Sequence, residues 1–374
     1  MPIPKLQHPP IYTGALAAYA MDRKTADQFV GFSPFDDESV VLWQDLGGGL
    51  MGLPRACCPV GPDDRRTDGV PGAMKSKFKA RDAQQERLVK EAAVLLAAGE
   101  SFQFEGATGV GKTWMACHLM AAVGRRSLVV LHKADLFDSW RRAIKELLGI
   151  KPGLIKQNTM DTAHPIVLAS IQTLAIPRRV PARVAQEFGQ VWWDECHRVP
   201  AQTFMRSLAM FPARVRVGLT ATPQRADKKH FVTEAHIGQV RVVGDMVPMK
   251  PKVSQFRTAY RIPRDRDGEQ VPHGPKSGWL FKAMAGSQRR NELITALCVQ
   301  AYQKGRHNVV FAAQRAHLDK LHLMAMAAGI PAADIGFYVG GLKGAAERDE
   351  AAGKRLVLAT YHMADTGTDY QSWD

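Results

Sequence analysis

The sequence has no hydrophobic run that approaches the roughly 20 residues needed to cross a bilayer, and no signal-peptide-like stretch follows Met1–Lys5. Its five cysteines are scattered, and none of their spacings resembles a zinc site. Internal repeats and low-complexity segments are also lacking. These absences argue against a membrane-spanning chain, a zinc-stabilised fold and a repeat protein. We therefore expect a cytoplasmic protein with no membrane partner.

Positive charge, by contrast, is abundant. Lys and Arg together number 50 against 36 Asp and Glu, a surplus of 14. Basic surfaces gain affinity for polyanions by releasing the counterions that surround phosphates, so the composition is compatible with a nucleic-acid partner, although many basic proteins have none. A hydrophobic content of 45% over 374 residues excludes a wholly disordered chain and supplies enough material for two or three domains.

The residue pattern changes near residue 75. Before it, in residues 1–74, helical periodicity is weak, and Ser39–Trp43 and Gly49–Pro54 predict a strand pair joined by a turn at Asp45–Gly48. The polar stretch Gly61–Gly69 predicts a linker or an exposed loop. We therefore expect a small β-containing accessory domain at the amino-terminal end.

Short apolar strands alternate with helices in the rest of the chain. This alternation predicts an α/β fold, with a parallel sheet covered on both faces, in residues 75–245 and a second such domain in residues 246–374. The predicted strands are Ser101–Phe104, Leu128–Leu131, Ile166–Ala169, Val191–Trp193 and Val215–Leu219 in the first region, and Asn308–Ala312 and Leu356–Ala359 in the second.

A glycine-rich segment follows the first of these strands. It has the pattern G-x-x-x-x-G-K-[ST], whose glycines let backbone N–H groups surround phosphates while the next helix N-terminus adds partial positive charge. Lys112 would reach the β- and γ-phosphates, and the Thr113 hydroxyl would be a ligand of Mg²⁺. The sequence therefore predicts an ATP-binding loop made of Gly106, Ala107, Thr108, Gly109, Val110, Gly111, Lys112 and Thr113.

A second polar cluster follows the strand Val191–Trp193. Asp194 comes at the carboxyl end of this strand, the end at which parallel sheets bind ligands, and would be a second protein ligand of Mg²⁺. Glu195 would orient the attacking water or take its proton. With His197 these residues form an Asp-Glu-x-His segment, which by itself also suits a solvated turn. After the glycine-rich segment, it predicts ATP hydrolysis with Lys112, Asp194, Glu195 and His197 as the catalytic residues.

Another buried strand runs into Thr220, Ala221, Thr222 and Pro223. The hydroxyls of Thr220 and Thr222 could hydrogen-bond to the acidic segment beside them and couple it to the rest of the domain. The same residues also suit a strand that ends in a plain Thr-Pro turn. The residues alone leave both interpretations open.

These elements, in this order, resemble the superfamily 2 helicases and translocases, and within them the XPB-like and type III restriction-like group that includes many phage helicases. The resemblance extends from about Lys75 to Asp374. It implies two RecA-like domains that close on ATP, with a nucleic-acid strand across both. In the segment Ala80–Glu86, it implies that Gln84 contacts adenine with the help of Arg81. The expected setting is a bacterial or phage-infected cell.

The resemblance also implies residues for the nucleic acid and for the second domain. In the family's fifth motif, Gly367 and Asp369 would lie near the nucleotide. Arg225, just after the Thr-Ala-Thr-Pro turn, is a further candidate because that turn lies near the expected cleft between the domains. The residues expected to contact the nucleic-acid backbone are His132, Lys133, Ser170, Gln172, Thr173, Arg225 and Thr360.

The chain departs from the family pattern near its end. Thr366 stands where a Glu is usual, and no Gln-x-x-Gly-Arg-x-x-Arg pattern, the family's sixth motif, occurs before Asp374. That motif supplies the arginine that stabilises charge on the γ-phosphate, an effect worth about 10³–10⁵ in rate. We therefore expect the isolated chain to bind ATP and to hydrolyse it slowly unless a partner supplies the arginine.

The favoured interpretation is an ATP- and Mg²⁺-dependent nucleic-acid helicase or translocase that acts on DNA rather than RNA, as a monomer. The alternative is an ATP-gated nucleic-acid binding module with weak or no hydrolysis. The two differ in whether bound nucleic acid stimulates turnover of ATP.

Overall fold

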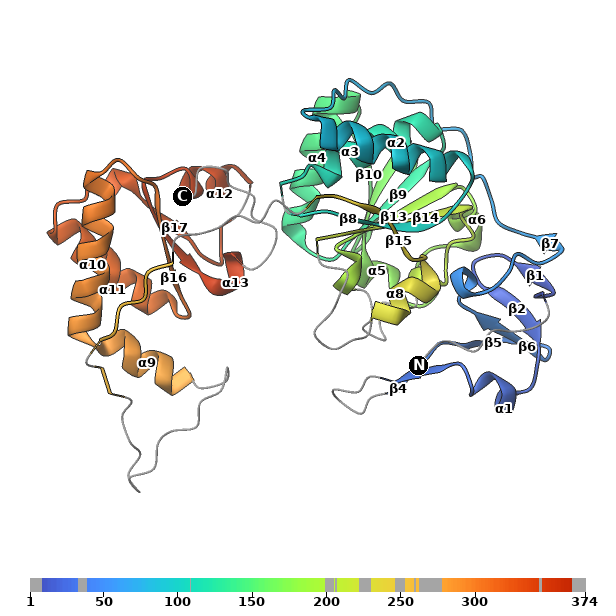
Figure 1. Ribbon diagram of the computed structural model, residues 1–374, viewed down its shortest axis with the longest axis horizontal. Helices are drawn as coiled ribbons and strands as arrows, with labels where there is room; N and C mark the ends of the chain where they lie inside the picture. The colour runs from blue at the N-terminus through green and yellow to red at the C-terminus, as the bar shows by residue number, and fades with distance from the viewer. Residues whose placement is uncertain are drawn as a thin grey trace. The chain divides into compact units, whose positions relative to one another are not determined.

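The computed structural model describes residues 9–32, 39–107, 109–198, 205, 207–221, 230–245, 253–258, 260–261, 278–342 and 345–364 (Figure 1). The predicted site residues that lie outside these ranges are Thr108, Thr222, Arg225, Gly367 and Asp369. The chain divides into two compact units, Met1–Pro248 and Met249–Asp374. Within the described ranges, no helix is long and apolar enough to span a membrane. A further division of the first unit near residue 74 stays a prediction.

A five-stranded sheet forms the amino-terminal part of the first unit. Its order is β5-β6-β2-β1-β7, and its neighbours are antiparallel except for β1 and β7. The expectation of a β-containing region is confirmed. The strands are β1 Tyr12–Thr13, β2 Ala17–Ala20, β5 Gln44–Gly47, β6 Leu50–Leu53 and β7 Asp63–Asp64, accompanied by the ribbon β3 Val30–Phe32 and β4 Ser39–Val41, the helix α1 Arg23–Ala26 and the 3₁₀ helix η1 Arg55–Cys57.

The strand pair predicted for this region is wrong in its partners. β6 pairs with β5 rather than with residues 39–43, and β4 pairs with β3. The chain reverses at the glycines 47–49, whose φ angles of 81°, 61° and 77° are accessible to glycine at little cost. Asp45, Leu46 and Gly47, expected in the turn, therefore belong to a strand.

An eight-stranded sheet forms the rest of the first unit. Its order is β11-β10-β12-β9-β13-β14-β8-β15, and all neighbours are parallel except β10 and β11. Each strand predicted for this region is present, with ends that shift by at most one residue, and the α/β class is confirmed. The strands are β8 Phe102–Glu105, β9 Ser127–Leu131, β10 Gly153–Lys156, β11 Thr159–Asp161, β12 Ile166–Ser170, β13 Gln190–Asp194, β14 Val215–Thr220 and β15 Val240–Val243.

Helices cover both faces of this sheet. On one face α2, α3 and α4 lie side by side, and α5 and α6 pack on the other (Figure 1). Because successive side chains of a strand point to opposite faces, Trp192 packs in the first hydrophobic cluster and Trp193 in the second. The helices are α2 Ala83–Ala97, α3 Lys112–Val123, α4 Ala134–Leu148, α5 Ile171–Leu174, α6 Ala182–Ala185 and α8 His230–His236, with the 3₁₀ helix η2 Cys196–Arg198.

The second unit contains a three-stranded parallel sheet in the order β16-β18-β17, which confirms the strands predicted there. Leu318 and Ala325 of α11 pack against it. At Gly336 a Cβ would lie 2.1 Å from the carbonyl oxygen of Ala351, so only glycine lets α12 approach β17 this closely. The elements are α9 Gly278–Gly286, α10 Gln288–Gln303, β16 Asn308–Ala312, α11 Arg315–Ala327, η3 Ala332–Asp334, β17 Ile335–Tyr338, α12 Ala345–Ala352, β18 Leu356–Thr360 and α13 Tyr361–Ala364.

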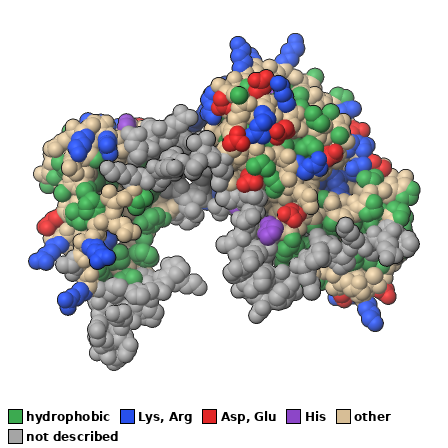
Figure 2. Space-filling view, viewed as in Figure 1, with side chains coloured by type: hydrophobic (Ala, Val, Ile, Leu, Met, Phe, Trp, Pro, Cys, Tyr) green, Lys and Arg blue, Asp and Glu red, His purple; other side chains and the backbone are tan. Residues whose placement is uncertain are grey.

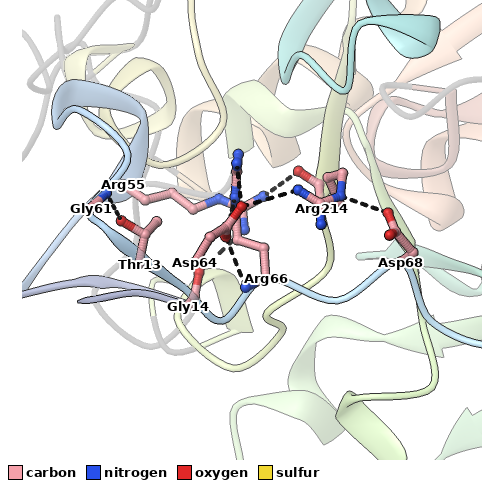
Figure 3. A network of polar contacts seen from close by, with 8 residues as sticks. All are labelled: Thr13, Gly14, Arg55, Gly61, Asp64, Arg66, Asp68 and Arg214. Carbon is pink, nitrogen blue, oxygen red and sulfur yellow. Dashed lines mark hydrogen bonds and ion pairs between the residues drawn. The ribbon is translucent and has the colours of Figure 1, made fainter.

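A polar network around β7 ties the amino-terminal sheet to the larger sheet (Figure 3). Arg214, which precedes β14, pairs with Asp64 at 3.1 Å and with Asp68 at 2.6 Å. Hydrogen bonds from Arg66, and then from Arg214, hold the pKa of Asp64 well below its usual range. The main chain of Thr67 also bridges to that of Ala213. The stretch predicted as a linker or exposed loop therefore contributes β7 to the amino-terminal sheet and is held to the larger sheet through Thr67 and the ion pairs of Arg214.

Arg55 joins the same network from η1 and is buried, with 7% of its surface exposed. Its Nη1 donates to the carbonyl of Gly14 at 3.3 Å, and its Nη2 donates to the carbonyl of Arg214 at 3.0 Å. Burial, and then repulsion from Arg216 and other arginines, holds the pKa of Arg55 well below its usual value. One guanidinium thus links the main chains of the two sheets.

Replacing this arginine, as Arg55→Met, is expected to destabilise the first unit. The carbonyls of Gly14 and Arg214 would lose a buried donor, and we expect the free energy of unfolding to fall by about 2–4 kcal/mol. Urea unfolding followed by tryptophan fluorescence measures this change. Arg241→Met, which breaks an exposed pair with Glu100, is the control and should cost less than about 1 kcal/mol. Equal losses in the two variants would show that the buried contacts of Arg55 do not hold the sheets together.

Candidate active site

The glycine-rich loop lies between β8 and α3. Its first residue, Gly106, donates its backbone N–H to the carbonyl of Thr220 at 2.9 Å, which ties the loop to the end of β14. Gly109 and Gly111 have φ angles of 82° and 91°, in the region that favours glycine. Gly111 is the N-cap of α3, so the first N–H groups of this 12-residue helix face the loop. This arrangement suits an anion.

Lys112 is the first residue of α3 and lies within the loop. Its Nζ donates to the carbonyls of Gly106 at 2.6 Å and Ala107 at 3.3 Å. The loop thus holds the ammonium group against its own backbone, where it would meet phosphates bound by the N–H groups. Thr113 follows in the first turn of α3 and is partly exposed.

Asp194 ends β13 and is buried, with 9% of its surface exposed. Its Oδ2 accepts a hydrogen bond from Trp140 Nε1 at 2.8 Å, and its Oδ1 accepts one from the backbone N–H of Glu195 at 3.1 Å. Burial raises the pKa of Asp194, and the hydrogen bond from Trp140 and the charge of Lys112 oppose that rise. The carboxylate is therefore oriented by two donors and lies within the field of the loop lysine.

Glu195 and His197 form a connected pair beside Asp194. Glu195 has a φ of 51°, a rare value for a residue with a side chain, which marks a sharp turn after β13. Its Oε2 lies 3.2 Å from His197 Nδ1, and the same nitrogen lies 3.0 Å from Thr220 Oγ1. His197 therefore connects the acidic segment to Thr220 at the end of β14. The sequence alone allows the Thr220 hydroxyl either to bond to this segment or to belong to a plain Thr-Pro turn, and in the structure the hydroxyl contacts His197.

The segment before the loop contacts it through Gln85. The Gln85 Oε1 accepts the backbone N–H of Arg81 at 2.9 Å, and its Nε2 donates to the carbonyl of Val110 at 2.9 Å. The Gln84 Nε2 donates to the carbonyl of Asp245 at 3.1 Å, and Arg81 Nη1 lies 3.5 Å from the carbonyl of Gly109. Sequence reasoning singled out Gln84 and Arg81 and missed Gln85.

The signal that could have found Gln85 is its helical spacing. It lies three and seven residues before Leu88 and Ala92, the buried residues of α2. That spacing places its side chain on the inner face of the helix, toward the loop.

Two of the segments predicted to contact nucleic acid meet at the carboxyl ends of neighbouring strands. β9 ends before His132 and Lys133, and β12, its partner in the sheet, ends at Ser170. Ser170 Oγ donates to Gln172 Oε1 at 2.6 Å, and Gln172 Nε2 donates to the carbonyl of His132 at 2.8 Å. Gln172 is exposed and holds the two segments together.

Thr173 and Thr360 lie in different surroundings. Thr173 is buried, and its hydroxyl accepts the backbone N–H of Gln157 at 2.9 Å, a contact that stabilises the local turn. Thr360 ends β18 in the second unit and is partly exposed. On the face shown in Figure 2, Lys and Arg side chains of the described residues are interspersed with acidic ones.

The residues present fit ATP and Mg²⁺. At Gly111 a Cβ would lie 2.6 Å from Gln85 Nε2, so a side chain at this position would displace the glutamine that contacts the loop. The Thr113 hydroxyl and the Asp194 carboxylate are hard oxygen donors, which suit Mg²⁺. In the part of the chain that the structure describes, no group of three or more His, Cys, Asp and Glu side chains could hold a metal.

Comparison with known proteins relates the chain to several helicases. Residues 77–225 match the family model described as "Type III restriction enzyme, res subunit". A protein of Acanthamoeba polyphaga mimivirus, L396, whose name describes an ATP-dependent RNA helicase, is 22% identical over 268 residues, which cover 70% of this chain and 51% of that protein. The probable helicase D10 of Escherichia phage T5 is 26% identical over 266 residues, which cover 70% and 55%.

A third relative matches a shorter part of the chain, and one solved structure is similar at lower sequence identity. The DNA 3'-5' translocase XPB2 of Sulfurisphaera tokodaii is 27% identical over 172 residues, which cover 45% of this chain and 36% of that protein. The helicase Lhr of Mycobacterium smegmatis, solved bound to ssDNA and AMP-PNP, has a TM-score of 0.45 and 16% identity, and covers 78% of this chain and 43% of its own. The chain spans about half the length of the first two relatives, 51% and 55%.

Proposed function

We propose that this chain, which belongs to the superfamily 2 helicases of the XPB-like and type III restriction-like group, is an ATP-dependent helicase or translocase. The observation that carries the proposal is the continuous edge of the larger sheet. There the glycine-rich loop after β8, the acidic pair after β13 and Thr220 at the end of β14 are joined by hydrogen bonds. A phosphate cradle beside an oriented carboxylate and a neighbouring base has the parts that ATP hydrolysis requires.

Each residue of the site has a role in this proposal. The loop N–H groups and Lys112 bind the phosphates, and Thr113 and Asp194 hold Mg²⁺. When bound, Mg²⁺ neutralises charge on the phosphate oxygens. Glu195 orients the attacking water and accepts its proton, a role supported by its position next to Asp194 and its contact with His197. Arg81 and Gln84 are proposed to contact the base, and Gly367 and Asp369, outside the described residues, to lie near the nucleotide.

The nucleic acid is proposed to bind along the segments after β9 and β12. His132, Lys133, Ser170 and Gln172 lie together there, at the end of the sheet where ligands bind. Arg225, which lies outside the described residues, is proposed as a further contact, and Thr360 is proposed separately to contact backbone in the second unit. Thr173 is buried, so its proposed part is to support this turn rather than to touch the strand. His197 and Thr220, with Thr222, would transmit changes at the phosphates to this surface. We favour DNA over RNA as the partner, a monomer as the active form and a cytoplasmic setting.

Stimulated hydrolysis tests the proposal. The full chain is assayed for phosphate release from ATP with Mg²⁺, alone and with single-stranded DNA, duplex DNA or RNA. We expect DNA to stimulate turnover, and because backbone contacts dominate, the apparent affinity for DNA should fall steeply as salt increases. ATP-sensitive binding of DNA without turnover would favour a binding module instead. A chain that binds neither ATP nor nucleic acid would contradict both functions.

A further inference from the structure

The indole of Trp140 contacts the carboxylate that is proposed to hold Mg²⁺. Trp140 lies in α4 and is fully buried, and its Nε1 donates to Asp194 Oδ2 at 2.8 Å. The second oxygen, Oδ1, accepts the backbone N–H of Glu195. Each oxygen of this carboxylate therefore has a protein donor, and together the two bonds define the plane of the group. The indole lies behind the carboxylate, in the hydrophobic core.

We propose that Trp140 is a positioning residue that orients Asp194 for Mg²⁺, an inference that rests on the nucleotide site proposed above. A carboxylate oxygen has two acceptor sites, so the bond from Trp140 leaves one site on Oδ2 for a metal. Groups that hydrogen-bond a metal-binding carboxylate fix its direction, and their removal typically lowers metal affinity or activity by about 10–100-fold. Without the indole N–H, Asp194 could rotate, and its buried oxygen would lack a donor.

The surroundings of Trp140 make it a rigid support. It packs in one hydrophobic cluster with residues of α2, α3 and α4, including Phe137 and Ile144 of its own helix. α4 packs directly on α3, the helix that carries Lys112 and Thr113. Helix α3, which carries Lys112, and the indole of Trp140 therefore belong to the same packed layer of helices. A shift of α4 relative to α3 would change the direction of the carboxylate relative to the phosphate loop.

Trp192 is a matched control within the same core. It is also fully buried in this hydrophobic cluster, and its Nε1 donates to Gln190 Oε1 at 3.0 Å. Trp→Phe at position 140 or 192 removes a comparable buried area and one indole hydrogen bond. Only Trp140→Phe removes a hydrogen-bond donor from the Asp194 carboxylate. A difference in nucleotide affinity between the two variants therefore reports on Asp194 rather than on core packing.

Calorimetric binding of AMP-PNP to the full chain, with excess Mg²⁺ and with EDTA, tests the inference without requiring turnover. The wild-type chain should bind more tightly with Mg²⁺ than with EDTA. Trp140→Phe should lose about 10–100-fold in affinity with Mg²⁺ and little with EDTA. Trp192→Phe should retain both affinities. Benzothienylalanine incorporated at position 140 keeps the shape of the indole but lacks the N–H, and should reproduce the loss even if Trp140→Phe fails to fold.

Three results would overturn the inference. Unchanged Mg²⁺-dependent affinity in the benzothienylalanine variant would show that the N–H does not position Asp194, while the nucleotide site itself would stand. An equal loss in Trp192→Phe would assign the effect to packing of the core. A wild-type chain that does not bind AMP-PNP with Mg²⁺ would remove the proposed nucleotide site, and the role of Trp140 with it.

Discussion

Glu195→Gln is expected to lower DNA-stimulated ATP hydrolysis by about 10²–10⁴-fold, the range of a general base, while ATP binding persists. Glutamine has nearly the same size and can keep the contact with His197, 3.2 Å from the present carboxylate oxygen. It cannot accept the proton of the attacking water. Because the backbone N–H of residue 195 still donates to Asp194, the carboxylate proposed to hold Mg²⁺ keeps this support. Phosphate release measures turnover, and AMP-PNP calorimetry measures binding.

Glu91→Gln provides the comparison for this variant. Glu91 pairs with Arg87 on the surface of α2, so its neutralisation changes the net charge equally without touching the site. Its turnover should match that of the wild-type chain. Turnover by Glu195→Gln at the rate of Glu91→Gln would remove Glu195 from the chemical step, and some other group would have to handle the water.

The parts of the site that are contiguous in sequence could be predicted without a structure. The loop Gly106–Thr113 and the pair Asp194–Glu195 each follow a short apolar strand, and parallel strands bring their carboxyl ends to one edge of a sheet. β13, β14 and β8 are neighbours in the observed sheet, so this reasoning placed the two motifs on the correct edge. Local sequence patterns were enough to place these two motifs near each other, because a parallel sheet brings the carboxyl ends of its strands to the same edge.

Contacts between distant segments could not be predicted in the same way. The apolar spacing of α4 predicts that Trp140 faces a core, but not that its N–H reaches Asp194, 54 residues later. Arg55 reaches Arg214 across 159 residues, and a cation in a weakly periodic region gives no sign of burial. At β5 and β6, three glycines in succession allowed more than one turn position, and the choice depends on strand register. In each case the deciding contact is tertiary.

Lys112→Ala is expected to abolish measurable ATP hydrolysis, because it removes the positive charge that the loop presents to the phosphates. Loss of one preorganised donor to developing charge costs about 10²–10³ in turnover, and loss of a charge-assisted hydrogen bond weakens binding of ATP as well. Phosphate release with saturating DNA and AMP-PNP calorimetry measure the two effects. Lys90→Ala, which removes an exposed lysine paired with Glu86, should behave like the wild-type chain.

Lys112→Arg separates charge from geometry at the same position. The ammonium of Lys112 lies 2.6 Å and 3.3 Å from the carbonyls of Gly106 and Ala107. A guanidinium is larger and planar, and its donors form a fork, so it cannot take the place of a compact point charge there. We therefore expect Lys112→Arg to remain as inactive as Lys112→Ala. Full activity of Lys112→Arg would show that the loop needs only a positive charge, and that the close fit of the ammonium to the Gly106 and Ala107 carbonyls has no part in turnover.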